Sequence, residues 1–542
     1  MNAVSAVRTP AQPVMTDADR DHLDECEVLL RRAIEMVKGP APGSQTTRSL
    51  AGNGAETPAE LASATPAHSA LPRKSHTATR IIGRILLSLT GLAVIGFLLL
   101  VLIGSQADFP VEPKGVGAEA ERTWQAVHFN QTAPTQVFQQ GFKLVGIGAV
   151  GSTNQGMSVA LSADGNTAVV GGPGPNNADR DRAPSVEPAG AAWVFTRSRG
   201  AWTQQGKKLV GSTSGYGGGL WSQGTSVALS ADGNTAIVGG PSDNRTMGAA
   251  WVFTRRGGAW TQEGGKLVGI GAHRAAEPPI PLGQGMSVAL SADGNTAIVG
   301  GWRAEAAWVF TRSNGVWTQQ GKLVGTGAVG SAHQGMSVAL SADGSTAIVG
   351  GWSDNSKSGA AWVFTRSGGV WKQQGKKLVG TGAVGNARQG MSVAVSADGN
   401  TVIVGGPHDN PGDRSVPFGL DAVGAAWVFT RSDGVWTQQG NKLVSTGAAG
   451  SARQGMSVAL SADGNTAILG GLANDGGVGA ASAFVRSGGQ WAQDQKMVGT
   501  GAMAASSVAL SGDGSVVMVG GPNVSGGVGA AWVFTRNGGG SY

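Results

Sequence analysis

One turn motif, Ser-x-Asp-Gly, recurs seven times between residues 138 and 542, and the sequence around it recurs with it. The repeats are 50 to 68 residues apart, which is too long and too irregular for β-helix rungs but typical of propeller blades. The aspartates of the motif are Asp164, Asp232, Asp293, Asp343, Asp398, Asp463 and Asp513. We therefore expect each repeat to form one blade of a propeller.

Each repeat holds four short apolar pieces that are separated by glycine and by Asp or Asn. In the fourth repeat they read KLVG (322–325), SVALS (337–341), TAIVGG (346–351) and AAWVFTR (360–366). Valine, tryptophan and phenylalanine favour β-strands, and glycine, at 91 of 542 residues, supplies the turns. Seven repeats of four strands predict an all-β, seven-bladed β-propeller at 138–542.

The two ends of the repeat array complement each other. The array opens with a lone KLVG piece within 138–146 and stops after AWVFTR (531–536), where no outer strand follows. Closing a ring with this first strand would remove open sheet edges, which otherwise favour aggregation. We expect the first strand to complete the last blade.

The sequence before the repeats predicts a membrane anchor. Residues 82–104 include 20 consecutive uncharged residues, 85–104, enough to cross a bilayer as one helix. Basic residues lie just upstream, at Arg73, Lys74, Arg80 and Arg84, and acidic ones follow the segment, which places the N-terminus in the cytoplasm. We expect a single-pass protein of the cell membrane with a periplasmic or extracellular propeller.

The other N-terminal segments carry weaker signals. Residues 17–38 predict a cytoplasmic amphipathic helix with one apolar stripe that includes Leu23, Cys26 and Leu30. This stripe has the spacing of a short coiled coil, so the helix either self-associates, docks on a cytoplasmic partner or remains without one. Residues 1–16 and the Pro/Ala/Ser/Thr-rich 39–80 are expected to be disordered, and 105–137 is expected to be a juxtamembrane linker.

The run SVALSADGNTAIVGGPSDN and the later GAAWVFTR resemble the FG-GAP-like repeats of bacterial surface proteins, which are distant relatives of the integrin α-chain propeller. This resemblance implies an extracytoplasmic propeller used in adhesion or binding. Integrin-type blades hold Ca²⁺ in a loop resembling D-x-D-x-D-G, whereas here the loop is ADGN or a close variant with one carboxylate. Because Ca²⁺ takes six to eight oxygen ligands, we expect Asp-Gly hairpin turns, no metal and no cofactor.

Up-and-down strand order places the ADGN and TRSGG turns on one face and the GGPSDN loops on the other. On the first face, repeated Arg and Asp predict a girdle of ion pairs, with polyanion binding as the alternative. The opposite face, here the variable face, holds the irregular stretches 173–189, 211–223, 271–284 and 407–423. Loops on a rigid scaffold carry specificity, so we expect ligand binding on the variable face.

Trp302 and Trp352 replace the proline that follows Gly-Gly in other repeats. With Trp221 they predict an aromatic platform for a sugar ring or a flat side chain, with loop packing as the alternative. The Asp-Asn pairs, such as Asp409 with Asn410, favour Asx turns. The full set of candidate ligand-binding residues is Tyr216, Trp221, Trp302, Trp352, His408, Asp409, Asp413, Arg414 and Asp421.

The sequence favours a binding module over an enzyme. It contains no nucleophile motif, phosphate loop or His-Glu-x-x-His, and we assign no catalytic residue. The alternative is a polysaccharide hydrolase or lyase that uses the polar insert with His408, Asp413, Arg414 and Asp421. A net charge of +6 over 542 residues is too mild to indicate nucleic acid, so the expected ligand is a protein or a glycan outside the cell.

Overall fold

The computed structural model describes residues 136–149, 151–174, 190–212, 222–271, 282–411, 422–448, 450–474, 478–499 and 505–537. All of them belong to one compact unit, Val116–Tyr542. The segments 1–16, 17–38, 39–80 and 82–104 and nearly all of the linker 105–137 lie outside the described residues. Within the described ranges, no helix has the length and apolar character needed to cross a membrane.

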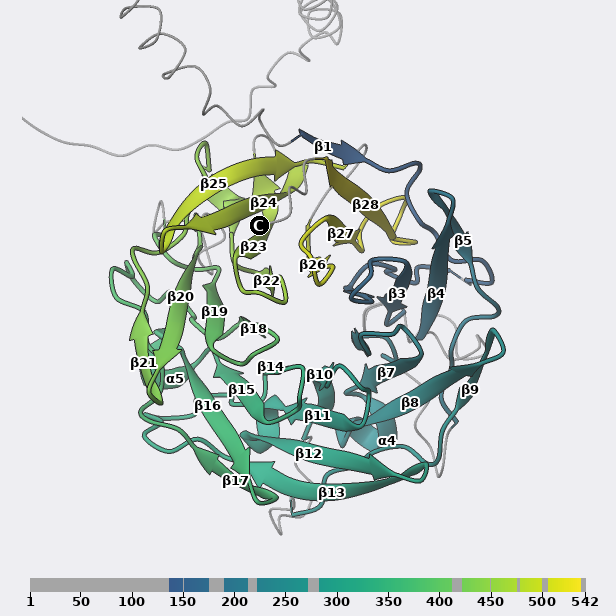
Figure 1. The fold of residues 1–542 in the computed structure, drawn as a ribbon, viewed down its shortest axis with the longest axis horizontal. Helices are drawn as coiled ribbons and strands as arrows, with labels where there is room; N and C mark the ends of the chain where they lie inside the picture. The colour runs from purple at the N-terminus through teal and green to yellow at the C-terminus, as the bar shows by residue number, and fades with distance from the viewer. Residues whose placement is uncertain are drawn as a thin grey trace, which may run out of the picture. The chain divides into compact units, whose positions relative to one another are not determined.

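The described strands form seven four-stranded antiparallel sheets arranged as a ring (Figure 1). The predicted seven-bladed β-propeller is therefore confirmed. We number the blades in chain order by their strands, as β2–β5, β6–β9, β10–β13, β14–β17, β18–β21, β22–β25, and β26–β28 with β1.

Each blade is built in the same order from the axis outward. The innermost strands are β2 (Ser158–Leu161), β6 (Ser226–Leu229), β10 (Gln284–Leu290), β14 (Ser337–Leu340), β18 (Ser392–Val395), β22 (Ser457–Leu460) and β26 (Ser507–Leu510). The second strands are β3 (Thr167–Gly172), β7 (Thr235–Gly240), β11 (Thr296–Gly301), β15 (Thr346–Gly351), β19 (Thr401–Gly406), β23 (Thr466–Asn474) and β27 (Val516–Gly521).

The third strands are β4 (Ala191–Ser198), β8 (Ala249–Arg256), β12 (Ala306–Ser313), β16 (Ala360–Ser367), β20 (Ala425–Ser432), β24 (Val478–Ser487) and β28 (Ala530–Asn537). The outermost strands are β5 (Ala201–Gln204), β9 (Ala259–Gln262), β13 (Val316–Leu323), β17 (Val370–Gln373), β21 (Val435–Gln438), β25 (Gln490–Met497) and β1 (Gln136–Gln139). Short helical turns lie between strands, at α4 (Asp243–Thr246), η2 (Trp302–Ala304), α5 (Asp354–Lys357) and η4 (Gly450–Ala452).

The apolar core lies between neighbouring blades. The second strand β7 is buried at every residue, whereas the outer strand β9 alternates exposed and half-buried residues. Val169 and Val194 of blade 1 pack in one cluster with Val238, Trp251 and Phe253 of blade 2. The AWVF tryptophans are therefore wedges between sheets, and Trp251 is fully buried. Burial on both sides explains why the second strands are apolar without alternation.

The ring closes with the strand that comes first in the chain. Strand β1 pairs antiparallel with β28, which places Phe138 opposite Thr535 (Figure 1). Leu144 forms a further bridge with Ala531 and is buried in the apolar cluster that joins blades 7 and 1. The innermost strands β26 and β2 are also in contact. The predicted closure is confirmed.

The outermost strand differs from the prediction. In most blades the paired strand is the A/VWTQ-like segment that follows AAWVFTR, and KLVG adds only one bridge, such as Leu378 with Ala361. In blades 3 and 6 the stretch between the A/VWTQ-like segment and the KLVG-like segment is one residue shorter. There the two segments join into one eight-residue strand, β13 in blade 3 and β25 in blade 6. The extra residue in the other blades interrupts the pairing.

Candidate functional site

The seven Ser-x-Asp-Gly turns form a closed ring of backbone hydrogen bonds on one face. The amide of Ala163 donates to the carbonyl of Ala231 at 3.0 Å, and the same bond links each turn to the next. In the last step the amide of Gly512 donates to the carbonyl of Ala163 at 2.9 Å. This ring occupies backbone groups that a ligand on this face would otherwise contact.

The turn aspartates are occupied within their own turns. Ser162 Oγ and the Asn166 amide donate to Asp164 Oδ1 at 2.5 and 2.9 Å, and Gly165 has φ 64°. Burial alone would raise the pKa of Asp164, but these hydrogen bonds and the charge of Arg197 outweigh it and hold the pKa below its usual value. The Asp-Gly turn prediction is confirmed. The same lowering holds for the other six turn aspartates.

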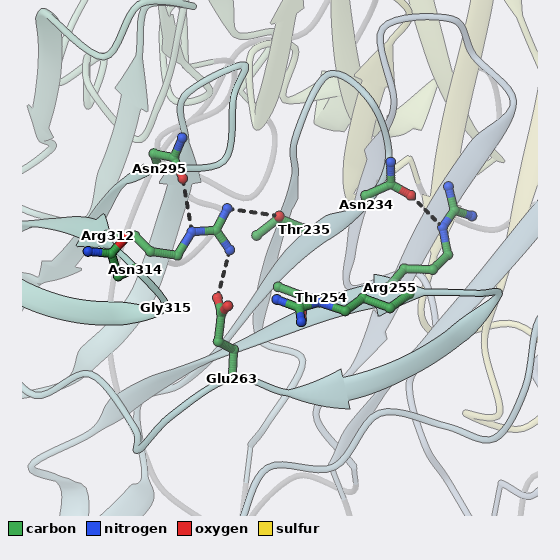
Figure 2. Close-up of a pocket in the computed structure, with 10 residues that line it drawn as sticks. Asn234, Thr235, Thr254, Arg255, Glu263, Asn295, Arg312, Asn314 and Gly315 are labelled. Atoms are coloured by element: carbon green, nitrogen blue, oxygen red, sulfur yellow. Dashed lines mark hydrogen bonds and ion pairs between the residues drawn. The ribbon is translucent and has the colours of Figure 1, made fainter.

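The arginines on this face join blades, but not through the turn aspartates as predicted. Figure 2 shows Arg312, whose Nε donates to Asn295 Oδ1 at 2.9 Å and whose Nη1 meets Glu263 Oε2 of the preceding blade at 2.6 Å. Arg255 likewise donates to Asn234 and to Gln205. The turn carboxylates already accept hydrogen bonds from Ser and Asn of their own turns. The arginines therefore donate to the Asn side chain of the turn and to Gln or Glu of the preceding blade.

The pocket in Figure 2 is therefore a junction between blades. It has a volume of about 280 Å³ and lies between the girdle arginines Arg255 and Arg312. Arg312 also donates to Thr235 Oγ1 at 3.4 Å, so all three of its nitrogens have partners in the protein. A ligand anion here would have to displace these bonds.

The Asp-Asn pairs of the variable face hold buried ion pairs. Asp354 is 1% exposed, and its Oδ2 lies 2.5 Å from Lys377 Nζ. Its Oδ1 accepts the amide of Val329 at 2.7 Å. Asp409 makes the same contacts with Lys442 and Val384, so both oxygens of this candidate are engaged within the protein.

Aromatic and cationic side chains are in contact across the variable face from Trp302 of blade 3 to Arg388, and Arg453 follows at the equivalent position before blade 6. The Trp302 and His333 rings are 4.9 Å apart, and the His333 and Trp352 rings are 5.1 Å apart, between centroids. The guanidinium of Arg388 lies 4.9 Å from the centre of the Trp352 ring. We call Trp302, His333, Trp352, Arg388 and Arg453 the aromatic–arginine row.

The backbone fixes the direction of this row. His333, Arg388 and Arg453 each precede a glutamine and have a left-handed φ of 57°, 56° and 45°. The glutamine is an anchor: Gln389 is 1% exposed, accepts the Gly380 amide at 2.6 Å and donates to the Gly380 carbonyl at 3.0 Å. Such a doubly bonded, buried amide holds the preceding residue in one place, and Gln334 makes the same two bonds with Gly325. Gln454, which follows Arg453, accepts the Ser445 amide at 2.7 Å, but its Nε2 has no partner among the described residues.

The arginine end of the row is strongly electropositive. Burial, followed by the nearby charge of Arg453, lowers the pKa of Arg388, and burial lowers the pKa of Arg453. Burial, followed by the charges of Arg388, Arg453 and Lys357, lowers the pKa of His408 to about 4. His408 is therefore neutral at pH 7. Within the described ranges, no carboxylate pairs with Arg388 or Arg453.

Two nitrogens of the row lack a partner among the described residues. Arg453 Nε is buried and makes no hydrogen bond in the described part of the chain, and the same holds for His333 Nδ1. His333 has a pKa lowered by burial, which outweighs the opposing charge of Glu305. Arg453 Nε–H is a buried donor without a partner, which is costly, so its presence beside the row indicates a place where a ligand can supply an acceptor.

Three of the predicted candidates meet here. Trp302 and Trp352 flank His333, and His408 lies within the field of Arg388 and Arg453. The other candidates except Asp409 lie outside the described residues, namely Tyr216, Trp221, Asp413, Arg414 and Asp421.

Sequence reasoning missed His333, Arg388 and Arg453. A signal was present: the residue before the repeated glutamine changes from repeat to repeat while the glutamine stays. The six residues at this position are Asn154, Ser222, Gly283, His333, Arg388 and Arg453. Variation next to a fixed anchor is what a specificity position would show.

Within the described ranges, no three His, Cys, Asp or Glu side chains lie close enough together to hold a metal ion.

The comparison with protein families agrees with the repeat pattern. The FG-GAP repeat family matches residues 317–364, which run from β13 into β16. No curated protein matches the sequence. Among solved structures, a chain of Kuenenia stuttgartiensis hydrazine synthase aligns at 12% identity over 72% of this chain and 98% of that chain, with a TM-score of 0.42, too low to support any argument. The protein is thus a seven-bladed β-propeller whose repeat is similar to the FG-GAP repeat.

Proposed function

We propose that this protein is an extracytoplasmic binding or adhesion module that is tethered to the cell membrane by residues 82–104 and binds its ligand on the variable face. The observation that carries the site is the aromatic–arginine row. The other face offers few free groups, because its turns, aspartates and most of its arginines are bonded to one another. A rigid ring that gathers aromatic side chains and arginines without carboxylate partners on one face is suited to recognition.

A polysaccharide-active enzyme is the second candidate. Hydrolysis of a glycoside usually needs two carboxyl groups that flank the bond. The described carboxylates near the row are all engaged: Glu305 accepts Ser331 Oγ at 2.5 Å and the Gln334 amide at 3.0 Å, and Asp354 and Asp409 are paired with Lys377 and Lys442. This engagement favours binding over cleavage. The enzyme alternative is tested by the same assay as the binding function.

The test uses the full-length chain, in mild detergent, on immobilised neutral and anionic polysaccharides, with retention and release of new chain ends both recorded. Retention without cleavage, lost in Trp302→Ala and Trp352→Pro, supports the proposal. Pro is chosen because the same loop carries Pro241 in blade 2. Arg256→Gln, an exposed change on the other face, is the matched control. Release of new chain ends would establish an enzyme. Retention that is unchanged in both tryptophan variants would contradict this site.

The tether and the N-terminal helix need separate measurements. Protease added to spheroplasts, from which the outer envelope has been removed, should digest the propeller and spare a tag at residue 1, because the positive residues lie before the span. A protected propeller would contradict the proposed topology. Self-association through residues 17–38 would appear as a dimer in detergent that Leu30→Asp abolishes, and a dimer that survives this change would place the contact elsewhere.

A further inference from the structure

The strongest unexplained feature of the row is its pair of arginines. The charge of Arg453 adds to the burial that lowers the pKa of Arg388, both side chains are half-buried, and the described residues supply no carboxylate to either. Two like charges that lose hydration without a counter-ion raise the free energy of the free protein. An anion placed between them would relieve that cost and accept the idle Arg453 Nε–H.

The aromatic part of the row adds a second requirement. Trp352 adjoins Arg388, and His333 continues the row to Trp302. Tryptophan rings bury large flat apolar surfaces and stack on flat or ring-shaped groups. A ligand that fits the whole row therefore carries an anionic group directly beside an apolar ring face.

We propose that the row binds an acidic polysaccharide, with Arg388 and Arg453 holding the carboxylate of one uronic-acid residue while Trp352 and Trp302 contact the faces of neighbouring sugar rings. This inference rests on the binding function proposed above. A uronate polymer places a carboxylate on each ring, which matches guanidinium next to indole along the row. Guanidinium groups bind planar carboxylates through two parallel hydrogen bonds, which a lysine cannot do.

His408 supports this assignment. It is 9% exposed and neutral at pH 7, so it adds no charge to the arginine pair. An acidic peptide could also supply a carboxylate, but it has no ring attached to every charge. Peptide binding is therefore an outcome of the test.

The test measures the dissociation constant of the full-length protein for oligogalacturonate and for its methyl ester, which has the same rings without the charge. Poly-glutamate tests the peptide alternative and a sulfated glycan tests a different anion. The arginine variants are Arg388→Asn and Arg453→Asn. Asparagine occupies the equivalent position in blade 1 at φ 53°, so the backbone is retained. Near-ultraviolet circular dichroism checks that each variant is folded.

We expect oligogalacturonate to bind and its methyl ester to bind at least tenfold more weakly. Each arginine variant should lose at least tenfold in affinity and Trp352→Pro severalfold, whereas Arg256→Gln should change it less than twofold. No binding of oligogalacturonate, or binding that ignores both arginine changes, overturns the inference. The inference is also overturned if poly-glutamate, the sulfated glycan or the methyl ester binds as tightly as oligogalacturonate or more tightly.

The two proposals fail in different ways. If a neutral glycan or a protein is retained by the full chain and released by the tryptophan changes alone, the variable face still binds its ligand and only the uronate assignment falls. If the retention of every ligand is unchanged in all variants of the row, the proposed binding face is contradicted as well.

Discussion

Gly380 lies so close to the indole of Trp427 that a Cβ at residue 380 would overlap the ring. Trp427 belongs to the next blade, and its Nε1–H donates to the carbonyl of Thr381 at 2.8 Å. The same pairing of glycine with the tryptophan of the following blade recurs around the ring, for example between Gly146 and Trp193. Blade-to-blade packing therefore depends on a missing side chain.

Gly380→Ala should destabilise the protein by about 2 kcal/mol, because the added methyl group overpacks a buried aromatic contact. The measurement is the free energy of urea unfolding. Gly265→Ala is the control: a Cβ there meets nothing within 4 Å, and the backbone is not left-handed. Equal losses in the two variants would contradict the packing argument.

At the contact between blades 5 and 6, serine replaces both the glycine and the tryptophan of this pair. Ser482 stands where the other blades have the AWVF tryptophan, and Ser445 stands where the preceding blades have the glycine. Ser482→Trp alone should destabilise, since the Cβ of Ser445 meets the new ring. Adding Ser445→Gly should recover about 2 kcal/mol, measured as the coupling energy of a double-mutant cycle. Additive changes would show that the two positions do not face each other.

The buried ion pair of blade 4 should contribute to stability. Asp354→Asn keeps the shape of the side chain but leaves Lys377 without its counter-ion, and we expect a loss of about 2 kcal/mol in the free energy of unfolding. Asp433→Asn, in an exposed turn, removes the same charge and should cost almost nothing. If the two variants lost similar amounts of unfolding free energy, the ion pair between Asp354 and Lys377 would contribute no more to stability than an exposed charge.

Stability should also fall in mildly acidic solution because of His408. Its pKa is about 4 in the folded protein and about 6.5 when unfolded, so the unfolded chain binds the extra proton. Stability is complete above pH 6.5 and is lost as the pH falls toward 4, by about 3 kcal/mol in total. His408→Gln should flatten this slope, leaving a smaller part from His333.

The turn aspartates act in a separate, more acidic range. Their pKa values are lowered, so their stabilising effect is present above pH 3.8 and is lost below it. Unfolding curves between pH 4 and 6.5 therefore isolate the histidines. A His408→Gln protein with the full wild-type slope in that range would contradict the buried position of this histidine.

The sequence determined the fold because each repeat carries its own strands, turns and core residues. Seven Ser-x-Asp-Gly turns predicted seven blades, and the unmatched first strand predicted closure by β1 against β28. The position of the outer strand was wrong, since KLVG and A/VWTQ are both plausible strands locally. One residue in the link decides whether they join, as β13 and β17 show.

Only the tertiary structure decided the candidate site. Trp302, His333, Trp352, Arg388 and Arg453 are spread over about 150 residues and come from different repeats. In each repeat taken alone, Arg388 or His333 is one more loop residue before a glutamine. Packing of consecutive blades brings these loops together, and burial beside a like charge then gives Arg388 a property that no single repeat encodes.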